Sequence, residues 1–348
     1  MAIGLLYDPI YLEHDTGQHP ENAGRLRAAV ARLRDQGLWE AVRHLRAEPA
    51  RTEALEAVHA PEYLRFLEAV SAAGGGWLTA DTLMSARSSE VARRAAGAAV
   101  RAVEAVLGGE TAQALALIRP PGHHARPAAG MGFCLINHAA VAAAEAVRRL
   151  GVERVFLLDF DVHHGNGTQE IFEADRRVLY ASTHQYPAYP GTGALEETGR
   201  GEGTGFTLNV PLPAGVGDAG LLRALDEVIA PAARRYRPEL CLASAGYDAH
   251  WANGRYLSSI QMGVTVTGFA ALVRRLRALA EELCGGRLAL VLEGGYDPEA
   301  LGWSVAATLN VLLDQPVRDP LGPPPWGEEA PDITELLEAV KRVHALTG

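Results

Sequence analysis

A short apolar run followed by alternating acids and a histidine constrains this chain more than any other stretch. Residues 155–158 are typical of a buried parallel strand, and Asp159, Asp161 and His163 follow them at alternate positions. An extended chain projects such residues to one side, at the carboxyl end of the strand, where open α/β sheets place their ligand sites. Ionised groups crowded into a half-buried place are costly without a cation. The stretch therefore predicts a metal site rather than helix caps and ordinary loop polars.

A second acid follows another buried strand later in the chain. Residues 239–243 are predicted to form a strand that leads through Ser-Ala-Gly-Tyr to Asp248, the natural third metal ligand. The three cysteines are far apart and form no Cys-x-x-Cys pair, which argues against a disulfide framework and a thiolate zinc cluster. Any metal in this chain must therefore be held by histidine and carboxylate.

Strand-like and helix-like patterns alternate along the 348 residues. Strands are predicted at 3–7, 112–118, 155–158, 178–182, 239–243 and 288–292. Helices are predicted at 23–36, 61–72, 86–107, 137–150, 218–235, 267–283, 298–313 and 332–346. This order predicts a three-layer α/β fold with a mainly parallel central sheet and helices on both faces. We find no repeat and no linker before residue 316, so we expect one domain over 1–348, ending in a proline-rich crossing and C-terminal helix at 316–348.

Three connecting segments carry further expectations. The polar loop 14–22 holds four residues that could be ligands, but exposed loop polars is the preferred interpretation of His14, Asp15, His19 and Glu21. The glycine run 74–76 is predicted to be a flexible connection between two helices. The long Gly- and Pro-rich loop 183–205 is expected to be functional, because loops of this length usually are.

Composition excludes several kinds of partner. The chain has no run of 18 apolar residues, and its start lacks the basic and apolar regions of a signal peptide, so we expect a cytoplasmic protein with no membrane partner. The formal net charge of -10, with no basic stripe, argues against nucleic acid. Neither Gly-x-Gly-x-x-Gly nor a Walker lysine is present, which argues against nucleotide binding.

Three further segments can contribute to the site around the predicted metal. Two prolines and a glycine in 119–124 end a strand abruptly and hold His123 and His124 in a rigid loop, although a surface histidine pair is the alternative. Small residues and one aromatic in 130–134 suit a substrate channel. The tyrosine after the double glycine, Tyr296, can act as a hydrogen-bond donor in a site or simply pack at the edge of the core.

Taken in order, these segments resemble the histone deacetylase superfamily, which includes acetylpolyamine amidohydrolases and acetoin-utilisation proteins and has the arginase-like α/β fold. Asn166 within the Asp-x-Asp-x-His-His-Gly-Asn motif, with Glu293 before the double glycine, looks like the class II branch. The matching pieces are Arg-Pro-Pro-Gly-His-His at 119–124, Gly-Phe-Cys at 132–134, the motif at 159–168, Pro-Gly-Thr-Gly at 190–193, Ser-Ala-Gly-Tyr-Asp at 244–248 and Glu-Gly-Gly-Tyr at 293–296.

The resemblance implies one zinc ion, Zn²⁺, held by Asp161, His163 and Asp248 with a position left open for water. Three ligands of this kind and one open site also suit catalytic zinc on chemical grounds. The resemblance further implies that His124 is the general base and later the acid that protonates the leaving amine. Asn166 would orient that histidine.

Other roles carried over from the resemblance concern charge and substrate contact. His123, paired with Asp159, would stay protonated and stabilise charge, and Tyr296 would hydrogen-bond the oxyanion. An inner site for a monovalent cation, expected to be K⁺, would use Asp159, Asp161 and Ser182. The substrate channel would be formed by Gly132, Phe133 and Tyr189 together with Arg25, which matches the arginine of the acetate-release cavity.

The expected function is a zinc-dependent amidohydrolase that removes acetyl or other acyl groups from acylated amines such as acetyl-lysine. An acetylpolyamine or a small metabolite remains open as substrate, as do the acyl-chain preference and the oligomeric state, a homo-oligomer included. A ureohydrolase with two manganese ions would need Asp-x-His-x-Asp, whereas this motif ends in His163-His164. A catalytically inactive reader of acetylated ligands is the remaining alternative.

The family commonly continues toward Asp-Pro-Leu after its last metal ligand, whereas this chain departs from that pattern. The segment 249–258 offers His250, Asn253 and Arg255 and contains no carboxylate. A guanidinium near the channel entrance would repel a polycation, so acyl-lysine-like substrates are predicted to be preferred over acetylspermine. The acids of the loop 183–205 that could reach the same mouth are Glu196, Glu197 and Glu202.

Overall fold

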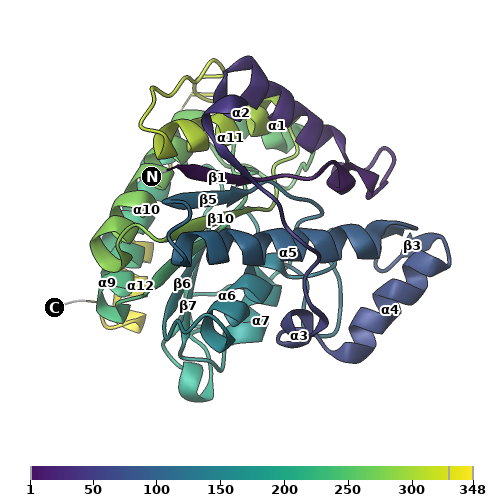
Figure 1. The fold of residues 1–348 in the computed structure, drawn as a ribbon. Coiled ribbons are helices and arrows are strands. Elements are labelled where there is room, and N and C mark those ends of the chain that lie inside the picture. The colour runs from purple at the N-terminus through teal and green to yellow at the C-terminus, as the bar shows by residue number, and fades with distance from the viewer. Residues whose placement is uncertain (1, 328–329, 347–348) are drawn as a thin grey trace.

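The computed structural model describes residues 2–327 and 330–346. Its main feature is an eight-stranded sheet in the order β2-β1-β5-β10-β9-β6-β7-β8, in which every neighbouring pair is parallel (Figure 1). In that order the strands are Arg43–Leu45, Ile3–Leu6, Gln113–Ala116, Leu288–Leu292, Leu240–Ala245, Val155–Asp159, Val178–Gln185 and Thr207–Leu212. The predicted α/β fold with a parallel sheet is confirmed.

Helices cover both faces of the sheet. On one face α5 (Ser88–Leu107) crosses β1, β5 and β10, and α6 (His138–Arg148) packs beside it over β6 and β9. The opposite face carries α10 (Val266–Cys284), α11 (Pro298–Leu312) and α1 (Gly24–Asp35), which pack in series. Figure 1 shows α5 across the front, with α1 and α11 together at the top. The three predicted layers are present.

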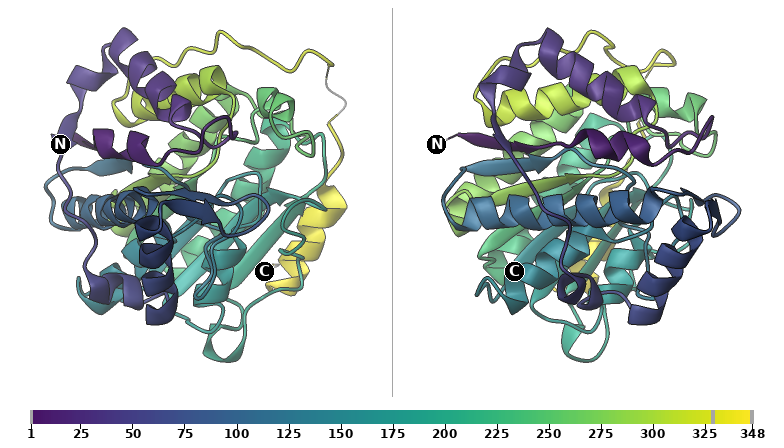
Figure 2. Two further views of the ribbon diagram at one scale, coloured as in Figure 1. Left: turned by 90° about the vertical axis from the view of Figure 1, so that its right-hand side faces the viewer. Right: turned by 45° about the vertical axis from the view of Figure 1, so that its right-hand side comes forward.

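Most of the remaining helices are shorter, and they flank these two layers. A helix predicted at 218–235 is interrupted by a π-helical stretch just before Pro231, whose ring nitrogen cannot donate to the helix ladder. The C-terminal α12 packs beside β8, as the left view of Figure 2 shows. The short helices are α2 (Leu38–Ala41), α3 (Thr52–Glu56), α4 (Pro61–Ala72), α7 (Asn166–Phe172), α8 (Asp218–Ala224), α9 (Ala230–Tyr236) and α12 (Thr334–Val343).

The burial of the central strands explains why their sequences are nearly unbroken runs of apolar residues. Every residue of β5, β6, β7, β9 and β10 is buried, because helices cover both faces of these parallel strands. The loops that follow β5, β10, β9, β6 and β7 therefore meet at one edge of the sheet. In the described part of the chain, no helix is both long enough and apolar enough to cross a membrane.

The glycine run at 74–76 is not the flexible connection that we predicted. Gly75 begins the short strand β3 (Gly75–Trp77), which pairs antiparallel with β4 (Leu83–Ser85). The φ angle of Gly75 is +103°, and a Cβ atom there would overlap the carbonyl oxygen of Met84. The run is therefore fixed by close strand pairing, for which only glycine leaves room.

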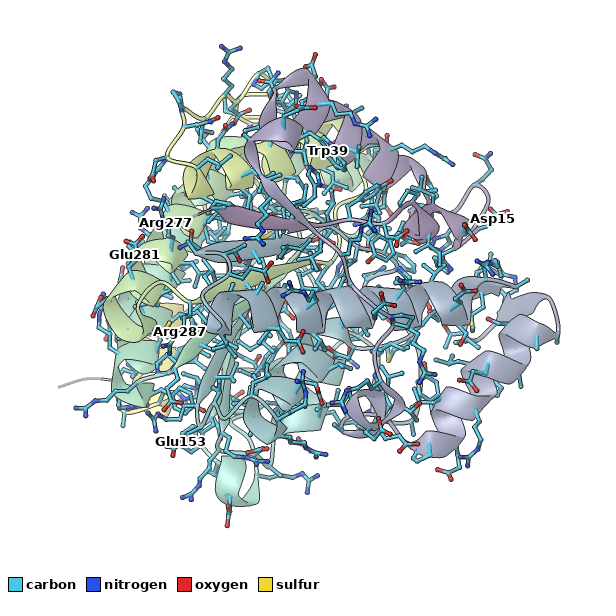
Figure 3. The ribbon with its side chains drawn as sticks, viewed as in Figure 1. Asp15, Trp39, Glu153, Arg277, Glu281 and Arg287 are labelled. Carbon is cyan, nitrogen blue, oxygen red and sulfur yellow. The ribbon has the colours of Figure 1, made fainter. Side chains whose placement is uncertain are left out.

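The preferred interpretation of the loop 14–22 as exposed is wrong for two of its residues. His14 and Glu21 are each 1% exposed, whereas Asp15 lies on the outer edge of the molecule (Figure 3). Both oxygens of Glu21 accept hydrogen bonds from the guanidinium of Arg119, at 2.9 and 2.8 Å. Arg25 donates to the same carboxylate at 3.0 Å. The ion pairs of Glu21 with Arg119 and Arg25 therefore hold this part of the loop inside the protein.

Replacing Glu21 with glutamine should destabilise the protein by about 3 to 5 kcal/mol, because it leaves Arg119 buried without its counter-charge. Burial alone would raise the pKa of Glu21, but Arg119 and His14 hold it well below 4.5. The stabilising contribution is therefore present above pH 4.5 and is lost as the pH falls below that value.

Urea unfolding at pH 7 and at pH 4 measures both effects. The control is Glu62→Gln, because Glu62 is exposed and pairs only with Arg65 at the surface, so that this substitution should leave stability nearly unchanged. Equal unfolding free energies for Glu21→Gln and the unsubstituted protein would contradict the interpretation.

Candidate active site

Three buried side chains converge where the loops after β6 and β9 meet. Asp161 and His163 lie just beyond the end of β6, and Asp248 lies three residues beyond the end of β9. One possible ligand atom of each lies within 4.8 Å of the others. The Nδ1 atom of His163 is 3.1 Å from Oδ1 of Asp161 and 3.3 Å from Oδ2 of Asp248. The three predicted metal ligands are therefore brought together.

The chemistry of this trio fits a divalent metal such as zinc, which takes histidine nitrogen and carboxylate oxygen. The Oδ2 atom of Asp248 is buried and has no hydrogen-bond partner among the described residues. Burial and the charge of Asp161 also raise the pKa of Asp248. A cation would relieve both costs, since it would neutralise two carboxylates held close together.

Two glycines make room for these carboxylates. A Cβ atom on Gly246 would overlap the carboxylate of Asp161, and one on Gly294 would overlap Asp248. The N–H of Gly294 donates to Oδ2 of Asp161 at 2.9 Å, and the N–H of Val162 donates to Oδ1 of Asp248 at 3.0 Å. The orientation of each carboxylate is thus fixed by the backbone.

Asp159, the first acid of the alternating run, faces a histidine instead of joining the trio. Its Oδ2 atom lies 3.1 Å from Nδ1 of His123. Burial alone would lower the pKa of His123, but the charges of Asp161 and Asp159 and the hydrogen bond to Asp159 raise it to about 10. His123 is therefore a protonated imidazolium at neutral pH.

The neighbouring histidine has the opposite character. Burial, followed by the positive charges of His123 and His163, holds the pKa of His124 well below 6.5. Its Nδ1 atom lies 2.8 Å from Oδ1 of Asn166, and since that oxygen can only accept, the proton of the neutral ring is on Nδ1. The Nε2 atom of His124 thus has a free lone pair that can take up a proton.

Tyr296 is buried close to the same trio. Burial and the charge of Asp248 raise the pKa of Tyr296 well above 10, so the phenol keeps its proton. Its hydroxyl has no hydrogen-bond partner in the part of the chain that the structure describes, and its ring packs edge-on against Phe133, with centroids 5.6 Å apart. The side chain can therefore donate a hydrogen bond to a ligand.

The predicted channel residues surround the catalytic histidine candidate. The ring of Tyr189 packs edge-on against His124 at 5.1 Å and against His163 at 6.1 Å. Gly132 has a φ angle of +55°, and a Cβ atom there would overlap the ring of His124. The structure thus brings Gly132 and Tyr189 to one side of His124 and Phe133 to Tyr296.

Arg25 and Ser182 lie deeper than the channel residues. Arg25 is buried behind Tyr296, where its Nε donates to the carbonyl of Gly295 and its guanidinium carbon lies 4.9 Å from the centre of the tyrosine ring. Ser182 is opposite Asp159 in the β6–β7 register, and its hydroxyl lies 2.9 Å from Nδ1 of His184. Among the described residues, no hydrogen bond or ring contact joins Arg25 or Ser182 to Gly132, Phe133 or Tyr189.

The sequence analysis assigned no role in the site to two acids that lie around it. The carboxylate of Glu293 accepts from the N–H groups of Gly122 and His123, so it holds the histidine loop in place. Its position after a buried strand, as with Asp248, was the available signal. Asp81 lies beside the hydroxyl of Tyr189, whose pKa is raised by burial and by the charge of Asp81. Only the β3–β4 pairing brings it there, and the sequence carried no signal for that pairing.

Two of the three polar residues expected at the channel rim after Asp248 lie inside the protein. His250 and Asn253 are fully buried, and Arg255 stacks over the ring of Trp251 at 5.4 Å. Among the loop acids, Glu197 is already engaged, since its carboxylate accepts from the backbone of Gly193 and Ala194 and from Gln169. No described contact places Arg255 beside a channel residue, so the preference for acyl-lysine-like substrates over acetylspermine stays a prediction.

Comparisons with known proteins agree with this geometry. Residues 19–312 match the family model described as "Histone deacetylase domain". The chain is 42% identical to a protein of Archaeoglobus fulgidus named "Probable deacetylase", over 99% of this chain and 98% of that protein. It is 40% identical to the "Histone deacetylase-like amidohydrolase" of Pseudomonas aeruginosa, over 87% of this chain and 79% of that protein.

A solved structure shows the same fold. The crystal structure of the HDA15 HD domain superposes with a TM-score of 0.89 at 33% identity, covering 99% of this chain and 95% of that one. The site also holds the buried Asp-His-Asp trio that a metal-dependent hydrolase needs. The chain therefore belongs to the histone deacetylase family of deacetylase hydrolases.

Proposed function

We propose that the chain is a zinc-dependent amidohydrolase that removes acetyl or other acyl groups from acylated primary amines such as acetyl-lysine. The observation that carries the proposal is the placement of a neutral histidine, His124, next to a three-donor metal site and a protonated tyrosine, Tyr296. A protein that only bound acetylated ligands without cleaving them would require neither a free imidazole lone pair nor a metal site.

The metal that we propose is Zn²⁺, held by Asp161, His163 and Asp248. When bound, zinc would polarise the amide carbonyl and lower the pKa of a water molecule to about 7. We further propose that a monovalent cation, K⁺, is held near Asp159, Asp161 and Ser182, where buried carboxylate charge accumulates. A single sheet carries all of these residues, which supports one catalytic domain over 1–348.

The side chains divide the proton transfers between them. Nε2 of His124 takes the proton of the attacking water, and the same atom then gives it to the nitrogen of the leaving amine. Asn166 keeps the ring in the required tautomer through its 2.8 Å contact with Nδ1. The imidazolium of His123 stabilises negative charge in the site. The hydroxyl of Tyr296 donates to the amide oxygen as that oxygen gains charge.

The carboxylate of Asp81 at the channel wall would favour substrates that carry, besides the acylated nitrogen, an ammonium or another N–H group. Asp81 lies beside Tyr189, and Thr82, the next residue, accepts a hydrogen bond from the N–H of Phe133 at 3.0 Å. Residues 77–82 therefore sit next to both channel aromatics and present a carboxylate there. This observation keeps acetylpolyamines as a second candidate substrate class beside acetyl-lysine.

Removal of any one metal ligand should empty the metal site. We expect about one divalent ion per chain, lost on treatment with a chelator, and lost again in Asp161→Asn, His163→Ala and Asp248→Asn. Asp159→Asn is the matched control, because Asp159 contacts His123 and lies outside the ligand trio, so that this variant should keep the ion. Elemental analysis measures the content. A fully loaded Asp248→Asn variant would exclude the proposed ligand set.

Loss of the tyrosine hydroxyl should lower kcat by about 10² to 10³-fold, because Tyr296→Phe removes a donor that acts mainly in the transition state. The ring contact with Phe133 and the metal content should be unchanged. Tyr189→Phe removes a hydroxyl from the channel wall and should have a much smaller effect on kcat. Near-normal turnover by Tyr296→Phe would remove the tyrosine from the mechanism.

Substrate charge should matter through Asp81. In Asp81→Asn, kcat/KM should fall several-fold for acetylputrescine, which keeps one ammonium, and hardly at all for an uncharged acylated alkylamine. The difference should shrink at high salt, since the charge is partly exposed to solvent. The matched control is Arg255→Gln, because Arg255 stacks on Trp251. An equal loss of kcat/KM for both substrates would show that Asp81 does not distinguish a charged from an uncharged substrate.

A further inference from the structure

Tyr296 is carried by a loop that contains two glycines, yet the loop is held at nearly every backbone polar group. The loop, 293–297, connects β10 to α11. Gly295 has a φ angle of +120°, which glycine adopts readily, and glycine itself restricts the backbone very little. The contacts are Glu293 N to Ala245 O, Gly294 N to Asp161 Oδ2, Tyr247 N to Gly294 O, Arg25 to the carbonyls of Glu293 and Gly295, and Asn253 Oδ1 to the N–H groups of Tyr296 and Asp297.

Asn253 makes the contact closest to the phenol-bearing residue. It lies in the short 3₁₀ helix Trp251–Arg255 and is fully buried. Its Oδ1 atom accepts from the N–H of Tyr296 at 2.6 Å and from the N–H of Asp297 at 2.9 Å. No other described contact holds the backbone of Tyr296 itself through a side chain. Asn253 therefore sets where the Cα atom of the tyrosine lies.

The amide of Asn253 is fully used. Its Nδ2 atom donates to the carbonyl of Tyr247 at 3.1 Å and to the carbonyl of His250 at 3.3 Å. The two N–H groups of Nδ2 thus each have an acceptor, and the two lone pairs of Oδ1 each have a donor. These four hydrogen bonds are the whole capacity of a primary amide. The donors hold the side chain to its own loop, and the acceptor holds the tyrosine loop. Asn253 is thus a bridge between the loops after β9 and β10.

The ring of Tyr296 is placed from two other directions. Phe133 packs against it edge-on, and the guanidinium of Arg25 lies over its face. These contacts fix the plane of the ring but leave the backbone free to slide along it. Misplacement of a catalytic group by about 1 Å can cost about 10²-fold in rate. Anchoring the backbone of Tyr296 therefore has a catalytic consequence, although Asn253 does not touch the substrate.

We infer that Asn253 is a positioning residue for Tyr296, acting through the acceptor oxygen of its side chain. The inference rests on the proposed role of Tyr296 as hydrogen-bond donor. It assigns to the segment after Asp248 a task in holding the catalytic tyrosine. Sequence position alone had suggested a part in the substrate rim.

Two substitutions separate the acceptor from the donors. Asn253→Leu has a similar shape and removes both, so kcat should fall by about 10 to 100-fold, with KM and divalent metal content nearly unchanged. Asn253→Asp keeps an oxygen that can accept from both N–H groups, but it replaces the donors with a second carboxyl oxygen and adds a buried charge when ionised. We expect it to keep kcat within about threefold while its melting temperature falls, since the carbonyls of Tyr247 and His250 each lose one of two donors and keep only the backbone N–H.

A double-mutant cycle with Tyr296→Phe provides the decisive readout. If Asn253 acts only by placing the tyrosine hydroxyl, Asn253→Leu should change the residual kcat of Tyr296→Phe by less than about twofold. Equal losses in both backgrounds would show a general structural effect and overturn the inference. Asn253→Asp being as slow as Asn253→Leu would exclude the acceptor role. If Asn253→Leu does not fold, Asn253→Ala takes its place in the cycle.

The outcomes also distinguish this inference from the proposed function. Near-normal kcat in Tyr296→Phe would remove the role on which the inference depends. A large loss in Tyr296→Phe together with normal kcat in a folded Asn253→Leu would leave the proposed function intact and refute the positioning role alone.

Discussion

The carboxylate of Asp161 joins the ends of three neighbouring strands, and the site is arranged around it. Its Oδ1 accepts from the backbone of His163, its Oδ2 accepts from Gly294 after β10, and Gly246 after β9 lies against it with no room for a side chain. The cost of burying this charge is offset by those N–H groups and by the imidazole nitrogens nearby. Placing one carboxylate there requires glycines on both adjacent loops, and it fixes the separation of those loops.

Two adjacent histidines acquire opposite protonation states from the same buried surroundings. His123 meets two carboxylates and stays charged, whereas His124 meets an amide oxygen and the charge of His123, and stays neutral. The state of His124 depends in part on that of His123, because the imidazolium of His123 is one of the causes that lower the pKa of His124. Two imidazoles whose pKa values shift in opposite directions are thus obtained from a single His-His dipeptide, because different groups lie beside each ring.

The sequence predicted the parts of the site that depend on local periodicity. Alternation after a buried strand gave Asp161 and His163, and the same reasoning gave Asp248, because the strand ends of a parallel sheet meet at one edge. Glu21 could not be found in this way, since its burial depends on Arg119, 98 residues away. The edge strand β8 was also missed: it contains Pro211, which an edge strand tolerates but which argues against a central strand.

The segment after Asp248 shows why nearness in sequence to a ligand is a poor guide to substrate contact. Its buried Asn253 is bound to four backbone groups, whereas Arg255 is exposed and stacks on Trp251. The carboxylate nearest the channel tyrosine comes instead from the turn at 77–82, far away in the chain. Under the proposed function, catalytic geometry and the selection of substrate charge would therefore be controlled by different loops. A change of Asp81 can alter which amines are accepted without disturbing the backbone that carries Tyr296, because no described contact joins the two.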